Sequence, residues 1–319
     1  MIFLYLILAV ILLVYFYLTW NFNYWSKRGV PTAKPRILLG NLPSIITRKE
    51  HMTSDFDRLY NEYKGKTPFI GIFQIRSPRL FVLEPELIKD VLIRNFKNFH
   101  DNEFGDLLDK DANPLFANNP FILKGEEWKE KRGEISPAFT SNRLKALYPL
   151  IEEVQGRMSK YLSEQILKKE PLEAREICAK YTTDVVSLAI FGVDAHSFTE
   201  EKSEIREMGR KLMSPSGLFI LKMFAISAFP VLKHVMEVKF TTEDVEKFFA
   251  NLMEQALKYR KDNNVQREDF LDYLIQIRDK KEKVGKSVDM AAHTISFFTD
   301  GFETSSIAIA HVLYEVKIV

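Results

Sequence analysis

The segment Trp128-Lys-Glu-Lys-Arg132 places an indole and a guanidinium group four residues apart, on one face of a predicted helix. Both groups donate hydrogen bonds and neither accepts them, so together they suit a bound carboxylate. The same pair is also typical of a tryptophan at the edge of a core beside a solvated arginine. Support from other residues is needed before this face is assigned to a ligand.

A second group of chemically capable residues lies in Asp300-Gly-Phe-Glu-Thr-Ser305, the centre of a mostly apolar stretch at 293–315. The stretch predicts one long helix, on which Asp300, Glu303 and Thr304 share one side because they are three and four residues apart. Gly301 costs such a helix about 1 kcal/mol relative to alanine. A polar, weakened centre between apolar ends indicates a chemical reason. The alternative is an amphipathic surface helix with an accidental glycine.

The composition excludes several classes of protein. With 319 residues, 46% of them hydrophobic, the chain can form one large or two ordinary domains. A net charge of +2 gives no electrostatic support for a nucleic-acid partner. The single cysteine, Cys178, excludes an internal disulfide and multi-cysteine metal sites, and it fits a reducing compartment. The six histidines lack ligand spacing, and no glycine-rich phosphate loop, HExxH or GxSxG motif is present.

The N-terminus predicts a transmembrane anchor over residues 1–22. Ile2–Trp20 is an uncharged apolar run of about 19 residues, long enough to cross a hydrocarbon core of about 30 Å. Lys27 and Arg28 follow it, so the positive-inside rule puts the body of the protein on the cytosolic side. The competing interpretation is a cleaved signal peptide, which needs a basic start, a shorter apolar run and a small-residue cleavage site. None of these is evident.

A proline-rich hinge at 23–45 follows the anchor, because Pro31, Pro35 and Pro43 fix the backbone and remove amide donors. An ordinary linker has the same composition. The remainder, 46–319, predicts a mainly α fold with a small β-sheet. We expect strands at 68–76 and 79–84 around a Ser77-Pro78 turn, an irregular loop at 98–120, and helices at 51–63, 126–139, 141–166, 174–192, 202–212, 242–262, 267–280 and 288–317. The apolar segment 217–232 is either buried core or a surface that dips into the membrane beside the anchor, and we favour the second.

The order of these features resembles microsomal cytochromes P450, most closely the insect detoxification type. The features are the anchor, the proline hinge, the strand pair, Trp128-xxx-Arg132 followed by Ser136-Pro137-x-Phe139, then Asp269-Phe-Leu-Asp-Tyr-Leu274 and Asp300-Gly-Phe-Glu-Thr-Ser305. The resemblance implies a haem-thiolate monooxygenase in the endoplasmic reticulum membrane, with heme b as its cofactor. It also implies electrons from an NADPH-dependent reductase and hydrophobic substrates such as xenobiotics, insecticides or hormone-like lipids.

The resemblance also implies roles for individual residues. Trp128 and Arg132 would bind a haem propionate, and Gly301, Glu303 and Thr304 would match the oxygen-binding helix, where the acid and the hydroxyl deliver protons through water. Asp300 departs from the small residue usual before the glycine. Near haem its carboxyl group would be desolvated and its pKa raised, especially beside Glu303, and it would either extend the relay or narrow the pocket. The 100–120 loop, 217–232 and 293–304 would line the substrate cavity.

The resemblance ends before the family's Glu-xx-Arg helix and its Phe-xx-Gly-x-Arg-x-Cys-x-Gly loop, whose cysteine ligates the iron. Cys178 follows no such motif, so we expect the 319-residue chain to lack its axial ligand and to show no thiolate-type Soret shift under carbon monoxide. Two interpretations of the chain follow. It is the N-terminal portion of an enzyme, from an incomplete gene model or a truncated isoform, or it is a non-enzymatic membrane-anchored protein.

Overall fold

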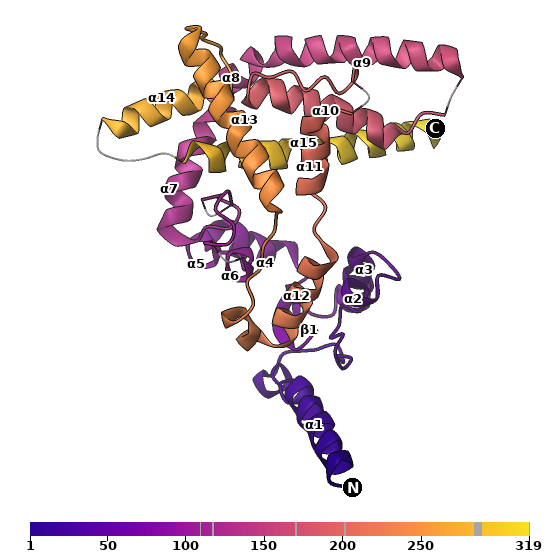
Figure 1. Cartoon of the computed structure of the whole chain (residues 1–319). Coiled ribbons are helices and arrows are strands. Elements are labelled where there is room, and N and C mark those ends of the chain that lie inside the picture. The colour runs from indigo at the N-terminus through magenta and orange to yellow at the C-terminus, as the bar shows by residue number, and fades with distance from the viewer. Residues whose placement is uncertain (109, 117, 170, 201, 284–288, 319) are drawn as a thin grey trace. The chain divides into compact units, whose positions relative to one another are not determined.

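Helices dominate the computed structural model, which describes residues 1–318 except 109, 117, 170, 201 and 284–288 (Figure 1). One antiparallel pair of strands accompanies the helices in the described residues. The predicted fold class, mainly α with a small β-sheet, is confirmed. The described chain forms two compact units, Met1–His100 with Leu221–Met236, and Asp101–Ile220 with Glu237–Val319.

The first unit contains the strands and the N-terminal helix. Its elements are α1 Ile2–Thr19, α2 Ser44–Thr47, α3 Met52–Tyr63, β1 Phe69–Gln74, β2 Ser77–Val82, α4 Pro85–Lys89, a π-helical turn Asp90–Arg94 and α5 Phe96–Phe99, with short 3-10 turns at Ser26–Arg28 and Pro230–His234. A small core of aliphatic side chains from the hinge, α3 and the strands, including Leu42, Leu59 and Ile70, holds it together.

The strand turn differs from the predicted one. Gln74 pairs with Ser77, so the two-residue turn is Ile75-Arg76, and Pro78 lies inside β2 opposite Phe73. The prediction of a Ser77-Pro78 turn is therefore wrong by two residues. A two-stranded sheet accepts a proline because its outer edge needs no ladder donor, and Ile75 adopts the left-handed backbone, with φ of 59°, that a tight turn requires.

The helix α1 is long and apolar enough to cross a membrane, and nearly all of its side chains are exposed. Its last turn contacts the rest of the unit. The Tyr17 ring stacks on Phe229 with 5.2 Å between centroids and lies under the Arg76 guanidinium at 3.9 Å. Phe229 belongs to the apolar segment 217–232, in which Ile226 is buried while Val231 is exposed. The segment thus has buried and exposed side chains, and it contacts the last turn of α1.

The second unit is an all-helical assembly. Its helices are α6 Phe104–Leu107, α7 Gly125–Ile135, α8 Ser141–Ala146, α9 Tyr148–Lys168, α10 Ala174–Ile190, α11 Glu204–Leu212, α13 Glu243–Asp262, α14 Phe270–Glu282 and α15 Met290–Ile318, with a 3-10 turn at Ser136–Phe139. α12, Gly217–Ala228, begins in this unit and ends in the first. The helix expected at 141–166 is two helices, because Pro149 has no amide hydrogen to continue α8 and begins α9 instead.

The helix α15 is the central element of the second unit. α10 makes the most extensive contact with it, and α11, α13 and α14 also pack against it (Figure 1). Phe297, Phe298 and Phe302 project from α15 into the main core, where Phe298 lies 4.8 Å from the Phe249 ring of α13. These aromatic side chains fix which face of α15 is buried and, by difference, which face stays open.

Candidate functional site

The helix α15 begins at a defined cap. Asp289 Oδ1 accepts the Ala292 amide at 2.9 Å, and Asp289 Oδ2 accepts Asn118 Nδ2 at 2.8 Å. An aspartate before the first turn satisfies a free amide and favours the positive helix end. The next residues, 293–298, are all buried in the core. Part of the stretch expected to line a substrate cavity is therefore core in this structure.

Gly301 lies where α15 approaches α10 closely. A Cβ atom at this position would stand 3.0 Å from Val186 Cγ2, inside ordinary van der Waals distance. Valine is branched at Cβ and stiff in a helix, so it cannot easily move aside. The glycine that is unfavourable for helix propensity is thus explained by packing, and its predicted role in cofactor binding stays a prediction.

Asp300 and Thr304 share the open face of α15. Both side chains are exposed, and Thr304 Oγ1 donates a hydrogen bond to the Asp300 backbone carbonyl. Although the Asp300 carboxyl group is accessible at the surface, the protein packed around it removes water and raises its pKa, while the positive charge of Arg132 opposes the rise. The rise expected from packing near haem stays a prediction, because the rise seen here comes from the protein alone. Glu303 is not among its causes.

Glu303 turns toward a different neighbour. Its Oε1 atom accepts a hydrogen bond from Arg175 Nη2 of α10 at 2.8 Å. Both side chains line a polar pocket of about 320 Å³, together with Arg206 and Arg210 of α11. The structure thus brings Asp300 and Thr304 together, with Asp300 within the electrostatic range of Arg132, and places Glu303 in a separate polar pocket.

Trp128 and Arg132 lie on α7, as the spacing predicted. Trp128 is half-buried and Arg132 is exposed. Within the described part of the chain the Arg132 guanidinium makes no ion pair, while its backbone carbonyl accepts Ser136 Oγ at 2.6 Å. An exposed guanidinium near the open face of α15 is a ready partner for an anionic ligand.

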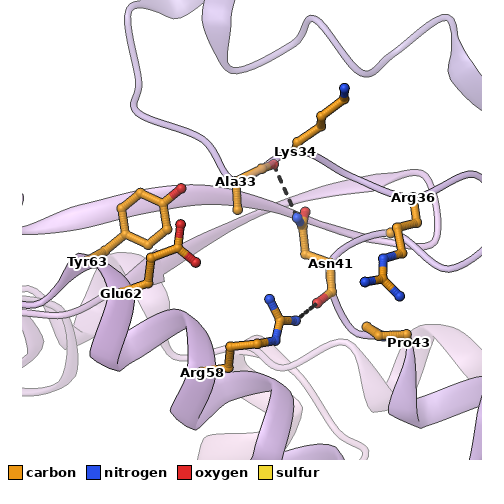
Figure 2. Close-up of a pocket in the computed structure, with 9 residues that line it drawn as sticks. Ala33, Lys34, Arg36, Asn41, Pro43, Arg58, Glu62 and Tyr63 are labelled. Carbon is orange, nitrogen blue, oxygen red and sulfur yellow. Dashed lines mark hydrogen bonds between the residues drawn. The ribbon is translucent and has the colours of Figure 1, made fainter.

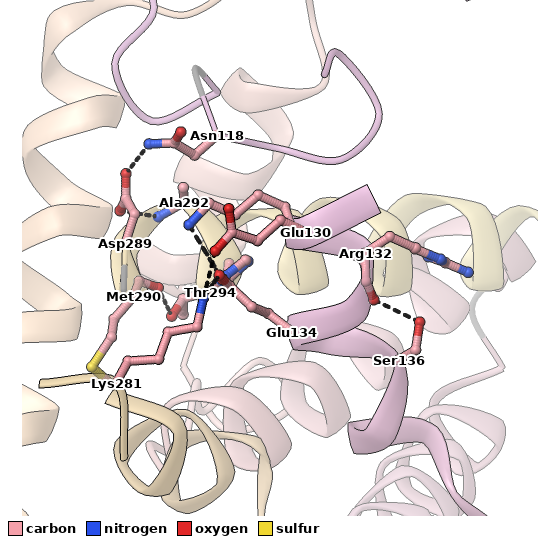
Figure 3. A network of polar contacts seen from close by, with 12 residues as sticks. Asn118, Glu130, Arg132, Glu134, Ser136, Lys281, Asp289, Met290, Ala292 and Thr294 are labelled. Carbon is pink, nitrogen blue, oxygen red and sulfur yellow. Dashed lines mark hydrogen bonds and ion pairs between the residues drawn. The ribbon is translucent and has the colours of Figure 1, made fainter. Parts of the chain in front are cut away.

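A buried ionic network joins α7, α14 and α15 (Figure 3). Glu134 Oε2 lies 2.6 Å from His293 Nε2, and the Glu134 carboxylate also accepts hydrogen bonds from Lys281 and, at 3.3 Å, from Lys131. The Tyr273 hydroxyl donates to the Glu134 carbonyl at 2.7 Å. Burial raises the pKa of Glu134, but these donors outweigh it and lower the pKa from 4.5 to about 2.

The sequence interpretation did not single out this network. The sequence did contain a signal for it, because His293 begins a mostly apolar stretch that predicts a buried helix. A histidine buried there needs a polar partner. Glu134 follows Arg132 by two residues and is nearly fully buried. The network thus connects the helix with the predicted propionate ligands to the helix with the predicted proton-transfer residues.

The donor set fits the carboxylates of haem, because Arg132 offers an uncommitted guanidinium beside an open helix face. Cys178 is different in kind. It is buried within α10, and burial raises the pKa of its thiol, which favours the protonated form. Among the residues that the structure describes, no group of three or more His, Cys, Asp or Glu side chains is arranged to hold a metal ion.

Comparisons with known proteins agree with this arrangement. Residues 30–317 match the family model described as cytochrome P450. The chain is 37% identical to the probable cytochrome P450 28d1 of Drosophila melanogaster over 314 residues, covering 97% of this chain and 62% of that protein. It is 32% identical to cytochrome P450 6A1 of Musca domestica over 309 residues, covering 95% of this chain and 60% of that protein. The chain therefore spans less than two thirds of the length of these relatives.

Proposed function

Because this chain belongs to the cytochrome P450 family, we propose that the protein acts as a haem-dependent monooxygenase on hydrophobic small molecules. Membership of the family implies haem as the cofactor. Bound haem supplies the activation of dioxygen and the transfer of one oxygen atom. The observation that carries the proposal is the open face of α15, which Asp300 shares with Thr304 and where Asp300 lies within electrostatic range of Arg132 on α7.

Arg132 and Trp128 would hold the cofactor by donating hydrogen bonds to a propionate group. Neither side chain accepts hydrogen bonds, so a carboxylate is a suitable acceptor for both. Gly301 keeps α15 close to α10 and leaves the helix backbone without a side chain at the centre of the site. Together these residues would hold haem next to the Asp300 and Thr304 face.

Thr304 and Asp300 hold the protons on that face. The Thr304 hydroxyl rotates from its hydrogen bond with the Asp300 carbonyl to present its proton to the site. The Asp300 carboxyl group has a raised pKa and takes up a proton more readily than an ordinary aspartate, so it resupplies Thr304 through water. Glu303, three residues further along α15, is held by Arg175 in the neighbouring polar pocket.

The helix α1 fits a membrane anchor. We place the protein in the endoplasmic reticulum membrane with its body on the cytosolic side, where a membrane-bound NADPH-dependent reductase supplies electrons. The exposed side of the apolar segment 217–232, next to Tyr17 of α1, dips into the same bilayer. Xenobiotics, insecticides and hormone-like lipids are the substrate classes that partition into this environment.

Oxygen coupling in a completed, haem-loaded chain that carries the axial cysteine, assayed with its reductase, tests the proposal. Thr304→Ala should lower product formed per dioxygen consumed by about tenfold or more, because general acid catalysis contributes at least this much. Ser305→Ala is the matched control, since it removes an exposed hydroxyl from the adjacent position of the same helix. Equal coupling in the two variants would remove Thr304 from proton delivery, and an absence of any oxygenated product in the unmodified enzyme would overturn the proposed function.

A further inference from the structure

A polar pocket of about 220 Å³ lies in the first unit, between the hinge and α3 (Figure 2). Three cationic side chains line it, those of Lys34, Arg36 and Arg58, against one carboxylate, that of Glu62. Figure 2 shows the guanidinium groups of Arg36 and Arg58 on either side of Asn41, while Lys34 Nζ points away from them. The lining therefore carries an excess of positive charge and of hydrogen-bond donors.

Hydrogen bonds fix the floor of this pocket. Asn41 is buried, and its side chain donates to the Ala33 carbonyl at 3.1 Å and accepts the Phe73 amide at 2.7 Å. Arg58 Nη2 donates to the Asn41 carbonyl at 3.2 Å. Gly40 also lines the pocket, and its φ of 62° and a Cβ position only 2.1 Å from the Phe73 carbonyl oxygen exclude any side chain. The pocket is therefore part of the packed hinge and not a gap between loops.

The cations of the pocket differ in how far they are already neutralised. Arg58 is shared with Asp55, whose Oδ1 lies 3.3 Å away. In the portion of the chain that the structure describes, Arg36 and Lys34 take part in no ion pair and are exposed. Burial and the neighbouring Glu62 raise the pKa of the Tyr63 hydroxyl at the pocket edge, so it remains a donor. The two guanidinium groups of Arg36 and Arg58 match the oxygen atoms of a phosphate.

The pocket belongs to the same compact unit as α1 and is tied to its end. Trp25 Nε1 donates to the Ile72 carbonyl at 3.0 Å, and the Phe22 ring lies 5.3 Å from the Phe73 ring, so the residues after α1 are fixed to β1. Asn41 is fixed to the same strand through Phe73. A pocket held in this way stays close to the bilayer that α1 enters.

The sequence around the pocket has the character of a membrane-surface segment. Residues 21–49 contain six Lys or Arg residues and no Asp or Glu. Arg36 and Gly40 close a tight loop, with reciprocal hydrogen bonds of 2.8 and 2.7 Å, and expose Ile37 and Leu38 at its tip. Basic clusters directly after a transmembrane helix attract anionic lipids, and apolar side chains beside them enter the headgroup layer.

We propose that this pocket binds the phosphate of an anionic phospholipid headgroup, with Arg36 and Arg58 as its two main ligands. The headgroup would hold the hinge against the membrane surface and so limit the tilt of the protein on its anchor. The inference rests on the proposed membrane attachment through α1, but it needs neither haem nor oxygenase activity. Its failure can therefore be told apart from a failure of the proposed function.

Isothermal titration of the full chain in neutral detergent, with short-chain phosphatidylglycerol as the probe, tests the proposal. Arg36→Gln should weaken binding by about tenfold or more, since a charge-assisted hydrogen bond is lost. Arg48→Gln is the matched control, because Arg48 is an exposed arginine of the same segment outside the pocket. Glu62→Gln should strengthen binding, because it removes the carboxylate from the lining.

Each remaining outcome has a defined meaning. Equal weakening by Arg36→Gln and Arg48→Gln would show diffuse attraction and overturn the site. Binding of short-chain phosphatidylcholine as tight as that of phosphatidylglycerol would overturn the requirement for an anionic headgroup. Inorganic phosphate that competes as well as the lipid would assign the pocket to free phosphate instead. Binding of phosphatidylglycerol that is weakened in Arg36→Gln but not in Arg48→Gln is the result we expect.

Discussion

Replacing Glu134 by glutamine should destabilise the second unit more than any other single charge removal on α7. The carboxylate is nearly inaccessible to solvent and is held between Lys131, Lys281 and His293. Glutamine keeps the shape but removes the charge, which leaves the two ammonium groups near a neutral amide. Breaking one partner of a buried ionic network is costly because the remaining charges are no longer compensated.

The size of the effect follows from the pKa. A carboxyl group whose pKa falls from 4.5 to about 2 on folding stabilises the native state by about 3 kcal/mol at neutral pH, since each pKa unit is about 1.4 kcal/mol. Because the pKa of the acid is depressed, this stabilisation is present above pH 4.5 and is lost as the pH falls toward 2. We therefore expect Glu134→Gln to lower the free energy of unfolding by about 3 kcal/mol at pH 7 and by much less near pH 3.

Denaturant unfolding of the full chain in detergent, followed by circular dichroism at several pH values, measures this difference. Glu130→Gln is the matched control, because Glu130 lies one turn earlier on α7 and binds the same Lys281 at 3.0 Å but is half exposed. Exposed ion pairs contribute about 1 kcal/mol or less. The reasoning is refuted if the two variants lose the same stability at pH 7, or if the loss in Glu134→Gln does not shrink in acid.

Three further predictions test other parts of the site. Arg132→Gln should lower several-fold the amount of haem that remains bound to the purified protein. Lys129→Gln, a substitution at an exposed position of the same helix, should leave the haem content unaltered. Equal haem content in the two variants would remove Arg132 from propionate binding. Gly301→Ala should destabilise the chain by about 1–2 kcal/mol, because the added methyl group contacts Val186, although alanine has the better helix propensity. Adding Val186→Ala to the same chain should reverse the loss. A Gly301→Ala variant that is more stable than the unmodified chain would contradict the close approach of α10. Asp184 is a buried residue of α10, and its Oδ1 atom accepts the Ser197 amide at 3.0 Å. Asp184→Asn should stabilise the chain at pH 7, because burial raises the pKa of Asp184 and its ionisation opposes folding as the pH rises above 3.8. The gain should vanish in acid, and a pH-independent effect would refute this cause.

The sequence predicted the helices well where apolar periodicity, proline and capping residues agree. The predicted helix at 288–317 is α15 at Met290–Ile318, and the one at 242–262 is α13 at Glu243–Asp262. The errors occur where backbone geometry is decided by tertiary context. The turn at Ile75-Arg76 uses a β-branched residue in a left-handed conformation, which local turn preferences disfavour. The spacing of apolar residues indicates a strand and its buried face, but not which two residues form the turn.

Spacing predicted which of the candidate residues share a helix face, but not which side chains they contact. Spacing placed Trp128 with Arg132 and Asp300 with Thr304, because both pairs are four residues apart on helices. Spacing could not predict that Arg175, which is distant in the sequence, forms an ion pair with Glu303. Nor could it predict the hydrogen bond between His293 of α15 and Glu134 of α7. Such contacts depend on how helices pack, and single-sequence patterns carry no information about pairs so distant in the chain.

The direction in which each acid of α15 points decides which one can work with Thr304. On an ideal helix Glu303 is 60° from Asp300 and Thr304 is 40° from it, since each residue turns the helix by about 100°. The aromatic side chains that bury one face of α15 fix this rotation, and Arg175 then holds Glu303 on the side of α10. Asp300 is left on the face of Thr304, with its pKa raised by burial and moderated by Arg132. If proton transfer in the haem-loaded enzyme followed sequence adjacency, Glu303→Gln would reduce coupling more than Asp300→Asn. The geometry predicts the opposite order, and measuring oxygen coupling in both variants decides between the two.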